Sequence, residues 1–291
     1  MEKIKFIADT ASDVPDEDLR EYNIDMPSVP ITIDGEGYFE RRSFSIPEFY
    51  EVLAKTSEIP ATSRVPADDY LGCYNRAFEE GYSDIINITI NSTGSGTNAS
   101  AQMARDLFYR EHPEAKDKCG IHIVDSRSYS MGYGYAVITA AKMARDGKPA
   151  VEILDFLENW ISRVEVYLGC YSLEYAKKSG RISAASAFVG DVLGLRPIIT
   201  LIDGNTRVVE KVRGDKQLVT RLIDCYRDIG ANKEDPVVVV CGSEPQYGEE
   251  LKVAFEKELG RPVHIYRAGA SIVINAGPKM VAFVCLAPNR R

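Results

Sequence analysis

β-Branched runs of strand length alternate with helical patterns through the first half of this 291-residue chain. The runs IKFIAD (4–9), DIINITI (84–90) and GIHIVD (120–125) are typical of strands. Helical patterns follow the last two runs, and an alanine-rich one ends at Gly147 before Pro149 opens the next. This alternation predicts an α/β domain with a largely parallel sheet. Because ligand sites in such sheets lie outside the carboxyl ends of the strands, the residues that follow each run are the first candidates for a site.

A second set of strand and helix patterns begins after about residue 164. Two extended runs in it, RPIITLID (196–203) and TRVVEKVR (206–213), are linked by Asp203-Gly204-Asn205, which predicts a β-hairpin. No internal repeat or long linker interrupts the chain. The sequence therefore predicts two α/β domains, residues 1–164 and 165–291, with a ligand cleft between them.

The stretch NSTGSGT (91–97) connects one predicted strand to the helical pattern that begins beyond Gly96. A strand that enters a helix through a glycine-rich turn presents unpaired N–H groups and the positive helix end to an anion. Hydroxyl groups that can rotate toward a ligand are carried by Ser92, Thr93, Ser95 and Thr97. One face of the helix is expected to carry Met103, Leu107 and Phe108. The alternative is an ordinary helix N-cap, for which one hydroxyl group suffices.

The other informative segment is AKKSGRISAASAFVGDVLGLRPIITLIDG (176–204). Arg181 follows a Ser-Gly turn, and a helical pattern of small side chains follows Arg181. The small residues are Ala184, Ala185, Ala187 and Gly190. Small residues on a core helix allow close packing, or their missing bulk leaves room for an apolar ligand, and both interpretations stay open.

The composition limits the partners that this chain can attract. The net charge is −8 and no basic stripe occurs, so nucleic acid is not an expected partner. The N-terminus lacks the regions of a signal peptide, and no segment approaches 18 consecutive apolar residues. We therefore expect no stable membrane insertion and a cytoplasmic location. The six scattered cysteines, several of them in apolar runs, are expected to be reduced and buried.

Motifs for metal or cofactor chemistry do not occur in the sequence. The three histidines, His112, His122 and His264, have no metal-ligand spacing with one another or with cysteine. GYGYAV (132–137) imitates a dinucleotide-binding loop, but Val137 replaces the third glycine and the run lies within a helical pattern. We expect no metal, no cofactor and no catalytic residue.

A catalytic role for the Ser95 loop remains the alternative hypothesis. Ser95 would be the nucleophile, or the loop would cradle a phosphate, in a hydrolase or a phosphoryl- or acyl-transfer enzyme. The segment TGSGT matches neither a nucleophile elbow nor a Walker A loop, and no general base or magnesium ligand set is evident. The sequence therefore favours binding over catalysis. A pure interaction protein with an empty cleft is a third hypothesis.

Eight short motifs, in order along the chain, resemble those of the DegV family of bacterial fatty-acid-binding proteins. They are DTASD (9–13), ATSRVP (61–66), NSTGSGT (91–97), VDSRSYSMGYG (124–134), LEYAKKSGRIS (173–183), GLRPIITLIDG (194–204), EKVRGDK (210–216) and NAGP (275–278). The resemblance covers essentially the whole length. It implies a two-domain α/β protein that buries a long-chain fatty acid between the domains and acts as a carrier rather than an enzyme.

The resemblance also implies which residues bind the ligand. Thr62 and Ser95 match the family's Thr and Ser that hold the carboxylate. Further ligand-binding residues are expected in the matching motifs at Ser63, Gly96, Thr97, Asn275 and Gly277. Characterised members present the carboxylate to a separate ATP-dependent fatty acid kinase, which makes an acyl phosphate. The arginines for that encounter match Arg181 and Arg213.

Two motifs depart from the family's pattern. The usual His-x-Gly-Pro-Gly is Asn275-Ala-Gly-Pro-Lys279 here, so an amide that carries no charge replaces an imidazole and a cation is added. Arg64 stands where the family often has Gln. These differences bear on the kinase partnership and the natural ligand rather than on the fold.

Overall fold

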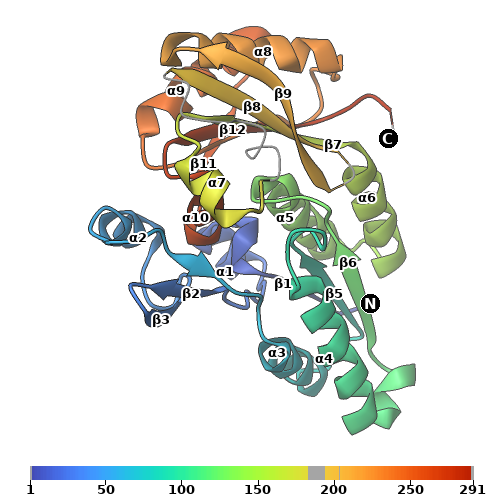
Figure 1. Ribbon diagram of the computed structural model, residues 1–291. Helices are drawn as coiled ribbons and strands as arrows, with labels where there is room; N and C mark the ends of the chain where they lie inside the picture. The colour runs from blue at the N-terminus through green and yellow to red at the C-terminus, as the bar shows by residue number, and fades with distance from the viewer. Residues whose placement is uncertain (1, 183–193, 203, 290–291) are drawn as a thin grey trace.

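The computed structural model describes residues 2–182, 194–202 and 204–289, which form three β-sheets with helices between and around them (Figure 1). The first sheet is entirely parallel, in the order β1-β5-β6. Its strands are β1 (Ile4–Ala8), β5 (Asp84–Thr89) and β6 (Gly120–Asp125). These strands coincide with the three predicted runs, so the predicted α/β organisation with a parallel sheet is confirmed here.

The second sheet has six strands in the order β11-β10-β12-β7-β8-β9. They are β7 (Val164–Cys170), β8 (Leu195–Ile202), β9 (Asn205–Arg213), β10 (Val238–Cys241), β11 (His264–Arg267) and β12 (Met280–Leu286). Only β10 and β11 pair in parallel, and the other neighbours are antiparallel. The pairing of β8 with β9 confirms the predicted hairpin.

A third, small sheet in the order β3-β2-β4 was not predicted. Its strands are β2 (Pro30–Ile33), β3 (Glu36–Phe39) and β4 (Ala61–Thr62). β4 has two residues and every side chain of β3 is exposed, so neither strand carries an apolar period that a sequence pattern would reveal. The same part of the chain contains α1 (Asp16–Glu21), α2 (Ile46–Leu53) and α3 (Ala67–Glu79).

Helices cover the first and second sheets on both faces. α5 (Met131–Arg145) contacts β1, β7 and β12 and so lies between the two sheets, beside α6 (Ala150–Arg163). α8 (Leu218–Ile229) and α9 (Pro245–Leu259) cover the far side of the six-stranded sheet (Figure 1). The remaining elements are η1 (Thr10–Ser12), α4 (Thr97–Glu111), η2 (Pro113–Asp117), α7 (Glu174–Ser179), η4 (Asp215–Gln217) and α10 (Ala270–Ala276). No helix within the described ranges has both the length and the hydropathy needed to span a membrane.

β12 shows how the core is divided. All seven of its side chains are buried because both faces of the strand are covered. Met280, Ala282 and Val284 join the core shared with the first sheet, whereas Val281 and Phe283 join a second cluster under α8 and α9. This split follows from the two-residue period of a strand.

Two details of the expected helices need comment. Of the residues expected on one face of α4, Phe108 is buried whereas Met103 is 56% exposed. Ala101 and Ala104 share the buried face with Phe108, at helical spacing. The small-residue pattern at 184–190 lies outside the described residues. All six cysteines are free thiols as predicted, five of them buried and Cys225 half-buried.

Candidate functional site

A pocket of about 460 Å³ opens where the carboxyl ends of the first sheet face the six-stranded sheet. The loop 92–97 after β5 and the segment after β6 form one wall, and β7, β8, β10 and β12 form another. β4 and α10 complete it. The predicted location, beyond the carboxyl ends of the parallel strands, is where this pocket lies.

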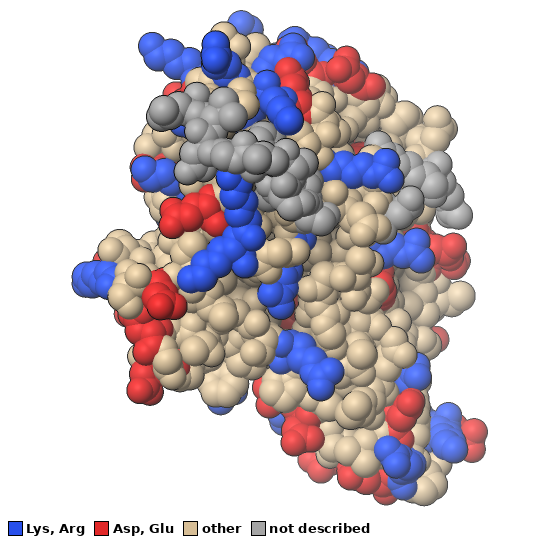
Figure 2. Space-filling model, in the orientation of Figure 1, with Lys and Arg blue, Asp and Glu red and all other residues tan. Residues whose placement is uncertain are grey.

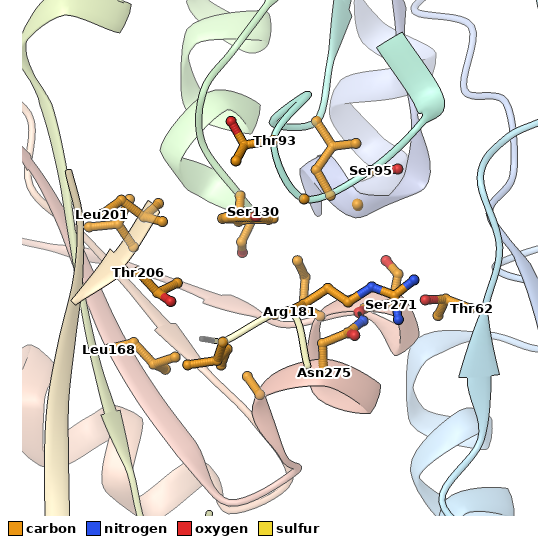
Figure 3. Close-up of a pocket in the computed structure, with 18 of the residues that line it drawn as sticks. Thr62, Thr93, Ser95, Ser130, Leu168, Arg181, Leu201, Thr206, Ser271 and Asn275 are labelled. Carbon is orange, nitrogen blue, oxygen red and sulfur yellow. Dashed lines mark hydrogen bonds between the residues drawn. The ribbon is translucent and has the colours of Figure 1, made fainter. Parts of the chain in front are cut away.

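One end of the pocket is rich in hydrogen-bond donors. Figure 3 shows Ser95, Thr62, Arg181, Asn275 and Ser271 around this end, on four separate segments of the chain. β4 is hydrogen-bonded to β2, and this pairing fixes Thr62 opposite Ile31. Within the described residues, the Thr62 hydroxyl has no hydrogen-bond partner and is free to bind a ligand. Ser63, Gly96 and Thr97 line the same pocket.

Ser95 precedes the N-cap residue of α4 and forms hydrogen bonds with the first turn of that helix. Its Oγ accepts a hydrogen bond from Thr97 N at 3.2 Å and donates to Thr97 Oγ1 at 2.9 Å. Thr97 Oγ1 in turn accepts from Val65 N at 3.2 Å, which ties the loop to the segment after β4. The loop is therefore both a helix start and a pocket wall, so the two interpretations of this stretch are compatible.

A buried asparagine shapes the rest of the loop. Asn91 Nδ2 donates to the Tyr129 hydroxyl at 2.9 Å and to the Gly204 carbonyl at 2.7 Å, while Asn91 Oδ1 accepts from Thr93 N at 3.2 Å. A Cβ on Gly94 would lie 2.1 Å from Tyr129 Oη, so the close approach of the ring requires glycine there. The tip of the β8–β9 hairpin is thus fastened to the loop.

Two arginines line the pocket and remain exposed. The guanidinium of Arg181 is directed toward the end of the pocket where Thr62 and Asn275 lie (Figure 3). Neither Arg181 nor Arg64 forms an ion pair with a carboxylate of the described residues. Figure 2, in the orientation of Figure 1, shows Lys and Arg side chains gathered across the middle of the molecule, over α7. Arg213 lies at the end of β9, exposed and outside the pocket wall.

α10 supplies the pocket with Asn275 but not with Gly277. Asn275 Nδ2 donates to Ser271 O at 2.7 Å, which leaves its second amide hydrogen for a ligand. Gly277 has a φ of 94° and ends the helix, where its N–H donates to Val273 O at 2.8 Å. It is not among the residues that line the pocket, so its predicted ligand contact has no support in this geometry.

Two buried carboxyl groups hold the start of α10. Asp13 accepts from Gly269 N at 2.7 Å and from the Ser130 hydroxyl, and Glu40 accepts from Ser271 N at 2.9 Å and from Thr10 Oγ1 at 2.7 Å. Burial raises the pKa of Asp13 to about 8; the Ser130 hydrogen bond opposes this rise and the Glu40 charge adds to it. Burial also raises the pKa of Glu40. The pair therefore binds protons more tightly in the folded protein than in the unfolded chain.

The opposite end of the pocket is mostly apolar. The apolar residues that line the pocket include Val166, Leu168, Ile199, Leu201, Met280 and Val284. Met280 and Val284 lie on the face of β12 that is turned toward the first sheet. Figure 3 places Leu168 and Leu201 across the pocket from Thr62, with Thr206 between the two leucines. The pocket thus has one end rich in hydrogen-bond donors and one end that is mostly apolar.

Several residues of this site were missed by the sequence reasoning. Tyr129 and Ser130 lie in the motif VDSRSYSMGYG, which offered hydroxyl groups after a predicted strand as a signal. Ser271 and Leu201 gave no signal, because a serine in an apolar segment and a leucine in a strand are ordinary core features.

The hydrogen bonds of Ser95 within the described residues include no general base. Its hydroxyl is hydrogen-bonded to Thr97, and no histidine or carboxylate of the described residues is hydrogen-bonded to it. A nucleophilic serine needs an adjacent base. Within the described ranges, no group of three or more His, Cys, Asp or Glu residues is arranged to hold a metal ion.

Comparisons with known proteins agree in fold and family. A sequence model described as "Uncharacterised protein, DegV family" matches residues 3–287. A DegV domain-containing protein of Caldanaerobacter subterraneus is 30% identical over 280 residues, which cover 96% of each chain. The crystal structure of a fatty acid binding DegV family protein from Streptococcus agalactiae has a TM-score of 0.86 at 25% identity, covering 99% of this chain and 100% of that one.

A stearic acid-binding protein from Eubacterium ventriosum has the same fold, with a TM-score of 0.87 at 21% identity and coverage of 99% of this chain and 98% of that one. The resemblance drawn from the eight sequence motifs is therefore confirmed. Because the family's sequence model spans almost the entire chain, this protein belongs to the DegV family.

Proposed function

We propose that this protein is a carrier that binds a long-chain fatty acid between two domains, residues 1–164 and 165–291. The division of one pocket into a donor-rich end and an apolar end carries this proposal. Among the described residues that line the pocket, there is no Asp, Glu or Lys, while Arg181 and the hydroxyl groups of Thr62 and Ser95 lie at one end. A carboxylate accepts from such donors, and each methylene buried at the other end contributes about 0.8 kcal/mol.

The head group would be held by residues from both halves of the chain. Thr62 donates its hydroxyl group to the carboxylate, Ser95 donates once its hydroxyl hydrogen rotates away from Thr97 Oγ1, and Asn275 adds its free amide hydrogen. Arg181 supplies a positive charge from the opening of the pocket. The relatives support a fatty acid as the ligand, because a DegV family protein of Streptococcus agalactiae with 25% identity is described as fatty acid binding.

The bound carboxylate would then be presented to a separate ATP-dependent fatty acid kinase in the cytoplasm. Arg181 suits this role because it lines the pocket and is exposed at the same time. Arg213 is exposed without reaching the pocket, so it would contact the partner alone. A charge at the edge of a site acts mainly on encounter and orientation.

Lipid extraction tests the binding proposal. The protein is purified from a heterologous host, extracted with organic solvent and examined by mass spectrometry, and delipidated protein is then titrated with fatty acids. We expect stoichiometric fatty acid in the wild type and much less in the double variant Thr62→Ala/Ser95→Ala. Thr220→Ala, which removes an exposed hydroxyl on α8, is the matched control and should retain the lipid. Wild-type protein that neither carries nor takes up any fatty acid would refute the proposal.

A further inference from the structure

A second cavity of about 460 Å³ lies beside the first, along α6 and the start of β7. Its apolar walls include Ile123, Leu154, Leu157, Ile161, Val164 and Leu201. Charged residues, among them Asp125 and Glu158, also line it. This cavity plays no part in the site described above.

The two cavities share one wall. Leu201 is the residue that lines both, among those that the structure describes. On β7, Val164 lines the second cavity and Val166 the first. Residues two apart in a strand project from the same face and lie about 6–7 Å apart, so the cavities are neighbours along one face of the sheet.

The position of Leu201 is fixed by the hairpin. Leu201 pairs with Thr206 across the two strands, and Gly204 at the turn accepts the hydrogen bond from Asn91 at 2.7 Å. A Cβ on Gly204, whose φ is 73°, would lie 2.8 Å from Asn91 Oδ1, so the turn and the loop are in close contact. The hairpin therefore cannot shift toward either cavity without breaking this contact.

We propose that Leu201 determines the length of the acyl chain that the pocket accepts, by closing its apolar end off from the second cavity. This inference rests on the proposed function. With the carboxylate at Thr62 and Ser95, the methyl end of the chain points toward the far end of the pocket, where Leu201 lies (Figure 3). Truncation of Leu201 joins the two spaces, and a longer chain gains apolar contacts with the walls of the second cavity.

The test compares the chain lengths that each variant retains. Delipidated protein is offered an equimolar mixture of saturated fatty acids of even length, and the bound lipid is extracted and measured by mass spectrometry. Leu201→Ala should shift the preferred length by two carbons and favour the longer acid about sixteenfold, since each buried methylene is worth about fourfold in affinity. Leu201→Phe should shift the preference to shorter chains. Val209→Ala, an exposed apolar residue of the same hairpin outside both cavities, is the matched control and should leave the profile unchanged.

A variant in the second cavity tests whether the additional carbons of the longer fatty acid enter that cavity. Leu154 lines that cavity alone, so Leu154→Phe should not alter the wild-type profile but should cancel the shift in Leu201→Ala. An unchanged profile in Leu201→Ala, or a shift that Leu154→Phe does not cancel, overturns the inference. If Leu201→Ala does not fold, a Leu201→Phe profile identical to that of the wild type overturns it. Wild-type protein that retains no fatty acid contradicts the proposed function instead, so the two failures are distinguishable.

Discussion

The side-chain amide of Asn91 donates a 2.7 Å hydrogen bond to the backbone carbonyl of Gly204, which follows it by 113 positions. Asn91 lies near the start of the segment between β5 and α4, and Gly204 lies at the turn between β8 and β9. This bond connects the polar loop of the pocket to the hairpin that forms its apolar wall. The bond therefore holds the polar loop in a fixed position relative to the hairpin.

Replacing Asn91 with alanine should destabilise the protein. The Gly204 carbonyl and the Tyr129 hydroxyl would lose a donor in a buried setting, which costs about 1–3 kcal/mol. Urea unfolding measures this loss. Asn232→Ala removes an exposed asparagine side chain whose Oδ1 accepts one solvent-exposed hydrogen bond, from Glu234 N at 3.1 Å, and should cost no more than about 1 kcal/mol. Equal stability of Asn91→Ala and Asn232→Ala would show that the hydrogen bond from Asn91 to Gly204 does not stabilise the fold.

The head-group residues should act together on affinity. Thr62→Ala and Ser95→Ala each remove a hydrogen bond to a charged acceptor, so each should weaken fatty acid binding by about 1.5–3 kcal/mol. The double variant should lose less than the sum because both hydroxyl groups serve one carboxylate. Calorimetric titration of delipidated protein measures the effect. Unchanged affinity in the double variant would mean that the carboxylate binds elsewhere.

The stability of the protein should fall as the pH rises toward 8. The folded-state pKa of Asp13 is about 8 against an ordinary value of 3.8, so the stabilising contribution of its proton is complete below about pH 4 and is lost progressively up to pH 8. Burial raises the pKa of Asp9 to about 6, which adds a slope of the same sign below that pH. The slope from one such group is at most about 1.4 kcal/mol per pH unit.

Asp13→Asn should flatten this profile between pH 6 and 8. The amide is neutral at every pH, and its oxygen can still accept the hydrogen bond from Gly269 N. Thermal unfolding should show a gain in Tm over the wild type that grows from pH 6 to pH 8. Asp155→Asn, at an exposed carboxylate on α6, serves as the control and should keep the wild-type slope. A variant at Asp13 with the wild-type slope would contradict the assignment of the proton.

Variants of Arg181 and Arg213 should distinguish fatty acid binding from presentation of the carboxylate to the kinase. Arg181→Ala should weaken fatty acid affinity severalfold and also reduce acyl phosphate formation by a cognate kinase, because Arg181 lines the pocket and is exposed. Arg181→Lys should restore part of both, since an ammonium group lacks the guanidinium fork. Arg213→Ala should reduce acyl phosphate formation alone. If Arg213→Ala also lowers affinity, the division of roles between the two arginines is wrong.

Local patterns in the sequence were enough for much of the fold. The strands of the first sheet and the β8–β9 hairpin follow from β-branched runs and a turn of Asp, Gly and Asn, whose conformational preferences act over a few residues. The position of the Ser95 loop followed from the rule that sites lie beyond the carboxyl ends of parallel strands. The expectation that Ser95 and Thr62 bind the same ligand came from resemblance to a family, because no local pattern connects the two residues.

The tertiary structure alone decided the shape of the pocket. β12 is apolar on both faces, so its sequence does not say that Met280 and Val284 face the ligand space while Phe283 faces α8 and α9. The partners of Asp13, Glu40 and Asn91 lie far away in the chain, and the energy of such contacts depends on burial that no short segment possesses. Leu201 owes its place between two cavities to the packing of the hairpin against the loop after β5, which exists only once both sheets have assembled.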